Sequence, residues 1–226
     1  MKNLTETLHH IPGTRREYVA FSGANATTPY LSDTQQKYQR KLFASVDEVL
    51  DRCDLHDGMT VSFHHAFREG DKVINYVMDK LAQRGLKGIT LASSSLMSCN
   101  APLIEHIRSG VIGKIYTSGM RGELADAISH GLMDEPVQIH SHGGRVNLIQ
   151  KGEIAIDVAF LAVSCSDEYG NASGNGGTSQ CGSLGYAMVD AQYAKKVVLL
   201  TETLKPFPNL PASIVQDRVD YVVQIE

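Results

Sequence analysis

Short apolar runs alternate with polar loops and amphipathic stretches along most of the chain. The apolar runs are rich in β-branched side chains and are predicted as strands at residues 59–63, 89–92, 114–117, 137–139, 158–163, 196–200 and 221–225. Strands of this kind that alternate with helical segments are typical of βαβ units, in which helices cover both faces of a parallel sheet. The pattern therefore predicts an α/β fold: a three-layer, Rossmann-like domain with a mainly parallel sheet.

Helical periodicity fills several of the intervals between the strands. Ser45 and Glu48 have the spacing of a capping box and predict a helix that runs to about Cys53. Further helices are predicted at residues 71–85, 102–109 and 124–131.

Residues 1–40 differ from the remainder of the chain. They are polar, contain Pro12, Gly13, Gly23 and Pro29, and show no sustained periodicity. We expect an extended N-terminal arm over residues 1–40 and one α/β domain over residues 41–226.

Composition narrows the class of protein. The 226 residues are 42% hydrophobic and 20% charged, with a formal net charge of −4. This charge argues against a nucleic-acid partner, which needs clustered Lys and Arg. No apolar run approaches the roughly 18 residues of a membrane span, and the N-terminal segment has no apolar core of a secretory signal. The four cysteines are scattered without a CxxC pair, which favours reduced thiols and a cytoplasmic protein without disulfides.

Polar side chains follow nearly every predicted strand. Because the carboxyl ends of parallel strands meet at one edge of a sheet, we expect these loops to form a single rim, where ligands of α/β proteins bind. Histidine, serine, arginine and glycine recur there, a composition that suits an anion. The candidate residues are His64, His65, Arg68, Ser94, Ser118, Arg121, His140, His142, Gly143, Gly144 and Arg145.

Other interpretations of the same residues stay open at this stage. The histidines could bind zinc, but they lack helical i, i+4 spacing and a nearby carboxylate, so we expect no metal. The glycine clusters at residues 143–144 and 174–177 could present N–H groups to an oxyanion, or they could be plain turns. Neither cluster matches a phosphate-binding or dinucleotide-binding loop.

Several motifs carry a resemblance to a known family. DGMTVSFHHAFREG (residues 57–70) resembles the opening strand and loop of the family I coenzyme A transferases, with His64-His65 in place of a glycine pair. DEYGN (residues 167–171) resembles a second segment of that superfamily. Together with LASSSL, IYTSGMRG, QIHSHGGRV and CGSLGYAMVDA, these motifs resemble the citrate lyase α chain from about Leu42 onward. That chain has two similar halves, and this sequence resembles only the first.

The resemblance implies a fold of coenzyme A transferase type and a specific chemistry. A carboxylate of citrate displaces acetate from the acetyl thioester of an acyl carrier protein, through a mixed anhydride. It implies catalytic roles for His64 and His65, citrate contacts for the other rim residues, and thioester contacts for Glu168, Gly170, Asn171, Gly176 and Gly177. It also implies acetyl-coenzyme A or a phosphopantetheine-type thioester as substrate, with no covalently bound cofactor.

The implied partners are the β and γ (acyl carrier) subunits of citrate lyase, in a homo-oligomeric assembly. Two alternatives stay open: a non-enzymatic ligand-sensing or assembly module on the same fold, and a thioester hydrolase. An isolated first half could also be inactive.

Overall fold

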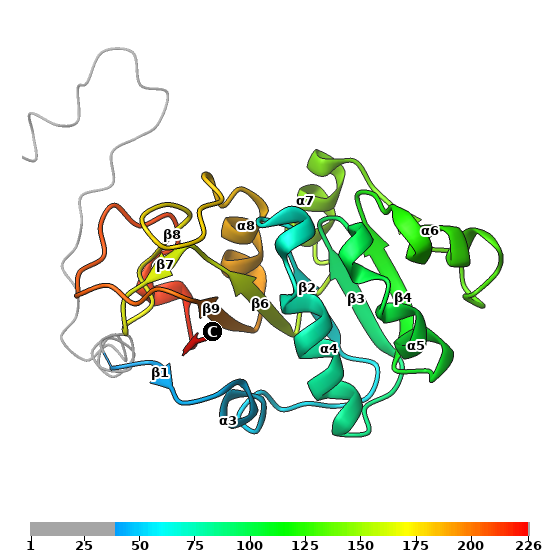
Figure 1. The fold of residues 1–226 in the computed structure, drawn as a ribbon, viewed down its shortest axis with the longest axis horizontal. Coiled ribbons are helices and arrows are strands. Elements are labelled where there is room, and N and C mark those ends of the chain that lie inside the picture. Colours follow the sequence, from blue (N-terminus) through cyan, green and yellow to red (C-terminus); the bar gives the residue numbers. More distant parts are fainter. Residues whose placement is uncertain (1–38, 226) are drawn as a thin grey trace, which may run out of the picture. The chain divides into compact units, whose positions relative to one another are not determined.

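One parallel sheet organises residues 39–225, the part of the chain that this computed structural model describes (Figure 1). Its eight strands lie in the order β1-β10-β9-β6-β2-β3-β4-β5, and every pair of neighbours is parallel. The strands are β1 (Leu42–Phe43), β2 (Thr60–Phe63), β3 (Ile89–Ser93), β4 (Ile112–Thr117), β5 (Gln138–Ile139), β6 (Val158–Ala162), β9 (Lys196–Thr201) and β10 (Tyr221–Gln224). The predicted parallel α/β fold is confirmed, with strand ends shifted by one or two residues.

Helices cover both faces of the sheet. They are α3 (Val46–Leu50), α4 (Val73–Gln83), α5 (Leu103–Arg108), α6 (Gly122–Ser129), α7 (His142–Gln150) and α8 (Tyr186–Tyr193). Short 3-10 turns lie at η1 (Arg68–Gly70), η2 (Ser98–Asn100) and η3 (Gln216–Arg218).

Strand β6 shows why there are three layers. Its side chains alternate between two hydrophobic cores: Phe160 packs in the core that contains residues of α3 to α6, and Leu161 packs in the core that contains residues of α7 and α8. Phe160 stacks on Phe63 of β2, with ring centroids 5.6 Å apart. Full burial of each such side chain contributes about 1.5–3 kcal/mol, so the two cores hold helices on opposite faces.

The first helix is capped nearly as the sequence predicts. Ser45 Oγ accepts the N–H of Glu48 at 3.2 Å, which satisfies one of the unpaired donors at the start of α3. Glu48 Oε2 accepts the N–H of Ala44 at 3.2 Å rather than that of Ser45. The helix ends at Leu50, earlier than expected.

Two helices were not predicted. Residues 140–145 were expected to be a polar loop, but α7 begins at His142, directly after Ser141, whose Oγ accepts the N–H of Gly144 at 3.1 Å. The glycine pair and the polar first turn hid this helix. Helix α8 was also missed, as were β1 and the antiparallel pair of β7 (Cys165–Ser166) and β8 (Ala172–Ser173). Nearly all of the predicted N-terminal arm lies outside the described residues.

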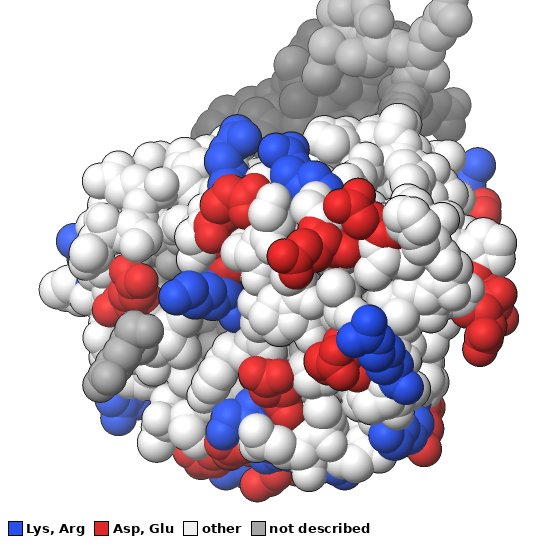
Figure 2. Space-filling model, turned by 45° about the vertical axis from the view of Figure 1, so that its right-hand side comes forward, with Lys and Arg blue, Asp and Glu red and all other residues white. Residues whose placement is uncertain are grey.

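The surface carries both signs of charge. Figure 2 shows Lys and Arg interspersed with Asp and Glu over the visible face. Among residues 39–225, no helix is both long and apolar enough to cross a membrane.

Asp167 holds together the segment around β7 and β8. Its Oδ1 accepts the N–H groups of residues 169, 170 and 171 at 2.9–3.0 Å. Its Oδ2 accepts from Asn171 Nδ2 at 2.8 Å and from the N–H of Asn209 at 2.9 Å. The carboxylate is fully buried and so replaces water with protein donors on both oxygens.

Removal of that carboxylate should destabilise the fold. We expect Asp167→Ala to lower the free energy of unfolding by on the order of 3–5 kcal/mol, because several buried donors lose a charged acceptor together. Urea unfolding followed by circular dichroism measures this change. Asp217→Ala on the exposed turn η3 is the control and should change stability by less than about 0.5 kcal/mol. An equal loss in both variants would contradict the role given to Asp167.

Candidate active site at the carboxyl edge of the sheet

Hydrogen bonds join the ends of four adjacent strands and their loops at the carboxyl edge of the sheet. His65 follows β2, and its Nδ1 shares a hydrogen bond with Ser94 Oγ at 2.7 Å. Its backbone N–H donates to the same oxygen at 3.1 Å. The N–H of Ser118, after β4, donates to the carbonyl of Ser94 at 3.2 Å. His140 follows β5, and its N–H donates to the carbonyl of Thr117 at 2.9 Å. The structure therefore gathers the loops that the sequence placed at one edge.

Positive side chains surround His65. The pKa of its ring is lowered, first by burial and then by the charges of His142, Arg68 and Arg121. Arg68 lies in η1, Arg121 directly precedes α6, and His142 lies in the first turn of α7. They are solvent-exposed, and they form no ion pair with another described residue. We call this group, His65, Arg68, Arg121 and His142, the cationic rim.

The amino end of α7 adds to the positive potential. A helix carries roughly half a positive charge at its N-terminus, and the N–H groups of the first turn are available to an anion. Gly143 lies in that turn and presents backbone rather than a side chain, whereas the N–H of Gly144 is already bonded to Ser141 Oγ. The ring of His142 contacts that of Tyr186 edge-on, with centroids 4.9 Å apart, which fixes the orientation of the imidazole.

Two candidate residues outside the cationic rim, Ser118 and His140, each have a buried polar atom without a hydrogen-bond partner in the described part of the chain. These atoms are Ser118 Oγ and His140 Nε2. The His140 ring stacks on Tyr116 at 6.1 Å. Such unsatisfied atoms are uncommon in native proteins and are often found where a ligand completes the hydrogen bonding.

His64 lies beneath this surface, unlike its neighbour. It is 5% exposed, and burial lowers its pKa to about 4, although the Asp190 carboxylate opposes this effect. The imidazole is therefore neutral at pH 7. The same direct role was expected of His64 and His65, but only His65 is partly exposed to solvent, whereas His64 is buried.

Arg145 corrects the sequence interpretation. It was expected to bind substrate, but it is 1% exposed and forms a two-pronged ion pair with Asp190, with N···O distances of 2.8 and 2.9 Å. Both terminal nitrogens are occupied, so the guanidinium is committed to the interior. Asp190 was missed, because its partner lies 45 residues away and no local pattern links the two.

The DEYGN segment also differs from expectation. Asn171 is buried and bonded to Asp167 and Gln216, and Glu168 pairs with Arg40 at 2.7 Å. Gly170 packs so closely on Val219 that a Cβ would lie 2.8 Å from its Cβ. These contacts give the segment a supporting role around β7 and β8.

Gly176 and Gly177 lie nearer the carboxyl edge of the sheet. The N–H of Gly177 donates to Ser164 Oγ at 3.0 Å, directly after β6. A Cβ on Gly177 would lie 1.7 Å from the carbonyl oxygen of Ser164, so only glycine fits this approach. Gly176 is exposed beside Cys165, with the sulfur 3.6 Å from a Cβ position.

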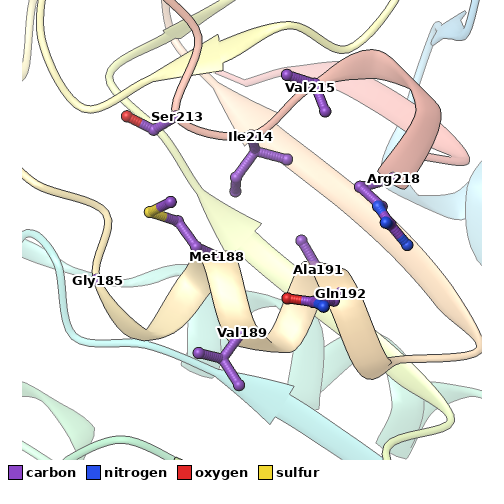
Figure 3. A pocket seen from close by; sticks show the side chains of 9 residues that line it. All are labelled: Gly185, Met188, Val189, Ala191, Gln192, Ser213, Ile214, Val215 and Arg218. Atoms are coloured by element: carbon purple, nitrogen blue, oxygen red, sulfur yellow. The ribbon is translucent and has the colours of Figure 1, made fainter. Parts of the chain in front are cut away.

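A cavity of about 410 Å³ lies elsewhere, between α8 and residues 213–218. Figure 3 shows Met188, Ala191 and Ile214 along it, with Arg218 at one end. Its lining is mainly apolar and contains none of the rim residues, so it suits a polar anion poorly. In residues 39–225, no three His, Cys, Asp or Glu side chains gather as a metal site.

Sequence reasoning also missed Asp71, which precedes α4. It is 5% exposed; its Oδ1 accepts the N–H of Val73 at 3.1 Å, and its Oδ2 is buried without a partner among the described residues. Burial raises the pKa of this carboxyl to about 6, against the opposing effect of backbone hydrogen bonds. A buried acid that titrates near neutral pH, three residues from Arg68, is a candidate for proton transfer.

Comparison with known proteins agrees with this geometry. An acyl-CoA transferase of Escherichia coli, solved as a thioester complex with CoA, superposes with a TM-score of 0.59 at 13% identity, covering 83% of this chain and 47% of that one. At this identity the likeness concerns the fold alone. The parallel sheet and its covering helices therefore have a fold of coenzyme A transferase type.

The match to one family is closer. The family model described as citrate lyase, alpha subunit (CitF), matches residues 39–226, and the chain belongs to this family. The citrate lyase alpha chain of Klebsiella pneumoniae is 59% identical over 206 residues, which are 91% of this chain and 41% of that protein. A citrate lyase alpha subunit of Streptococcus mutans, solved in complex with citrate, is 51% identical with a TM-score of 0.82, covering 84% of this chain and 37% of that one. The chain thus spans about 40% of the length of these relatives.

The raised pKa of Asp71 predicts how stability depends on pH. Because the folded pKa of about 6 exceeds the ordinary 3.8, the protonated carboxyl stabilises the fold; this contribution is complete below about pH 3.8 and is lost as the pH rises through 6. We expect Asp71→Asn to gain stability relative to the unsubstituted chain between about pH 4 and pH 7, by at most about 3 kcal/mol.

Urea unfolding across this pH range checks the expectation. Asp126→Asn on the exposed face of α6 is the control and should show a difference that does not vary with pH. A constant difference for Asp71→Asn as well would show that its carboxyl is ionised throughout.

Proposed function

We propose that this chain is the first part of a citrate:acyl-carrier-protein thioester transferase, the alpha subunit of citrate lyase. The feature that supports the proposal is the cationic rim at the carboxyl edge of the sheet, where hydrogen bonds join the loops and the charges of His142, Arg68 and Arg121 act on His65. A tricarboxylate requires several cations on one surface, and arginine pairs with a carboxylate through two parallel hydrogen bonds. Family membership and the citrate bound to the Streptococcus mutans relative support the same ligand.

The proposed reaction exchanges one acyl group for another on sulfur. A citrate carboxylate attacks the carbonyl carbon of the acetyl thioester, and the tetrahedral intermediate expels the carrier thiolate to give a mixed citric–acetic anhydride. The thiolate then attacks the citryl carbonyl and releases acetate. Both steps place negative charge on a carbonyl oxygen, so the site must supply donors to that oxygen and exclude water.

His65 is suited to that task. Its backbone N–H donates to Ser94 Oγ, and on this proposal the hydroxyl hydrogen of Ser94 is donated to the Nδ1 of the ring. This assignment puts the ring proton on Nε2, as a donor. The lowered pKa of His65 keeps the imidazole neutral near pH 7. A neutral donor of this kind polarises a carbonyl oxygen without adding another charge to the rim.

The thioester would approach from the side of Gly176 and Gly177, whose loop meets the end of β6. Ser118 and His140 would complete their hydrogen bonding with the bound carboxylates. On this proposal the thioester is a substrate that is carried by an acyl carrier subunit or coenzyme A. The working assembly contains the β and γ subunits of citrate lyase and more than one copy of the alpha subunit.

Loss of rim charge should weaken citrate binding selectively. We expect Arg68→Gln and Arg121→Gln each to raise the Kd for citrate by on the order of 10-fold, because a charge-assisted hydrogen bond contributes about 1.5–3 kcal/mol. Isothermal titration calorimetry with citrate measures the effect. Arg108→Gln on the exposed end of α5 is the matched control and should bind as the unsubstituted chain does. Equal affinities in all of these proteins would place citrate elsewhere.

The isolated chain should be a poor catalyst. It covers 41% of the Klebsiella relative, and a rim that faces solvent cannot keep water from a thioester. A misplacement of 1 Å can cost about 10²-fold in rate, so we expect acetyl-to-citryl exchange at least about 10²-fold below that of a full-length relative.

Mass spectrometry of the acylated carrier measures this exchange, with and without the remaining part of the relative's chain added in trans. Addition should restore activity. Full exchange by the 226-residue chain alone, as a monomer in sedimentation, would show that its site is complete.

A further inference from the structure

A buried ion pair lies directly beneath the cationic rim and joins four elements. Arg145 of α7 donates through Nη1 and Nη2 to the two carboxylate oxygens of Asp190 on α8. Ser62 of β2 donates its hydroxyl to Asp190 Oδ2 at 2.7 Å. The Nη2 of Arg145 also donates to the carbonyl of Ala92 in β3 at 3.0 Å. Both charged side chains are at most 1% exposed.

Each anchor of this pair is close in sequence to a rim residue. Ser62 precedes His64 and His65, and Ala92 precedes Ser94, which holds the His65 ring. Arg145 lies one helical turn after His142. Ser62 and Ala92 are direct partners in the parallel register of β2 and β3. The pair therefore contacts β2, β3 and α7 within three residues of His65, Ser94 and His142.

Stability alone does not account for such a pair. Burial removes both charges from water, and apolar side chains of similar volume often replace buried ion pairs with little loss or even a gain in stability. An apolar replacement cannot supply directional hydrogen bonds. The planar fork of arginine fixes the angle between α7 and α8 and the distance of both from the sheet.

We propose that Arg145 and Asp190 are a positioning pair for the transfer reaction, which hold the amino end of α7 and the His64-His65 loop in the geometry that binds citrate. This inference rests on the proposed function, since it concerns the same rim. Neither residue contacts substrate; the pair acts through His142, Gly143 and His65.

The pair also controls the electrostatics of His64. The charged or titratable groups that act on this buried ring are Asp190 of α8, Arg145 of α7 and the adjacent His65. Burial has the largest effect and keeps the ring neutral; Asp190 raises the pKa of His64, and Arg145 lowers it by a smaller amount. Loss of either member alone should shift this pKa in a direction fixed by the charge that remains.

Citrate binding by a double variant is the first test. Arg145→Met/Asp190→Leu removes both charges together, so no unpaired charge is left in the interior. We expect the variant to fold with a near-native circular dichroism spectrum and to bind citrate on the order of 10-fold more weakly, a smaller effect than the roughly 10²-fold that a 1 Å error costs a reaction rate. Arg108→Met/Glu105→Leu, which removes an exposed pair in the same way, is the control and should leave the Kd unchanged. Unchanged affinity in the Arg145→Met/Asp190→Leu protein overturns the proposal.

Imidazole titration by NMR is the second test, and it needs no ligand. Arg145→Met should raise the pKa of His64 from about 4 towards its ordinary 6.5, whereas Asp190→Leu should leave the ring neutral across the same range. General loosening of the core would hydrate His64 and raise its pKa in both variants, so shifts in the same direction overturn the proposal.

The two tests separate this proposal from the proposed function. If the unsubstituted chain fails to bind citrate, the proposed function fails. The ring signals of His65 and His142 in the double variant then decide on the positioning pair: displaced signals support it, and unchanged signals overturn it.

Discussion

A sheet in which every strand runs in the same direction has one edge where all the strand ends meet, and the chemistry of this protein depends on that constraint. Residues that lie far apart in the sequence, such as Arg68, Arg121 and His142, act on one imidazole because parallel strands deliver their loops to the same place. An antiparallel arrangement of the same strands would divide these loops between two edges. The parallel direction of the strands thus brings the loops of the rim together, and the side chains on those loops determine its specificity.

Concentrated positive charge is unfavourable when no anion is bound. Burial lowers the pKa of His65 most, and the neighbouring charges lower it further, so loss of the ring proton relieves part of the repulsion. An anionic ligand reverses the balance, because its carboxylates offset the repulsion among the cations. On the proposed function, repulsion among these cations favours binding of an anion, and the neutral histidine is a hydrogen-bond donor to it.

Much of the fold could be predicted from the sequence, because the strands are buried on both faces and so appear as continuous apolar runs. Residues 158–163 illustrate this: β6 alternates between two cores, and no polar side chain interrupts it. The gathering of His65, Ser94 and Ser118 could also be predicted, since it needs only the parallel order of the strands.

The missed features share one physical cause, which is the burial of polar groups. Arg145 of α7 faces the interior and anchors the helix. Because its side chain is charged, the buried face of α7 does not show the apolar periodicity that predicts a helix. Asp190 and Asp71 have their properties only because tertiary packing removes water from them. No local pattern records which carboxylate will be buried or which donor will meet it.

The register of β2 and β3 has a consequence for how this family can vary. Side chains alternate along a strand, so a change of one residue in the length of β2 would exchange its two faces. Phe63 would then occupy the position of Ser62 beside Asp190, and the following histidines would swap their buried and exposed places. Substitutions in these strands can be absorbed one at a time, but insertions and deletions cannot. Divergence in length should therefore be confined to the amino-terminal edge of the sheet, where a turn such as residues 84–88 can grow without moving the rim.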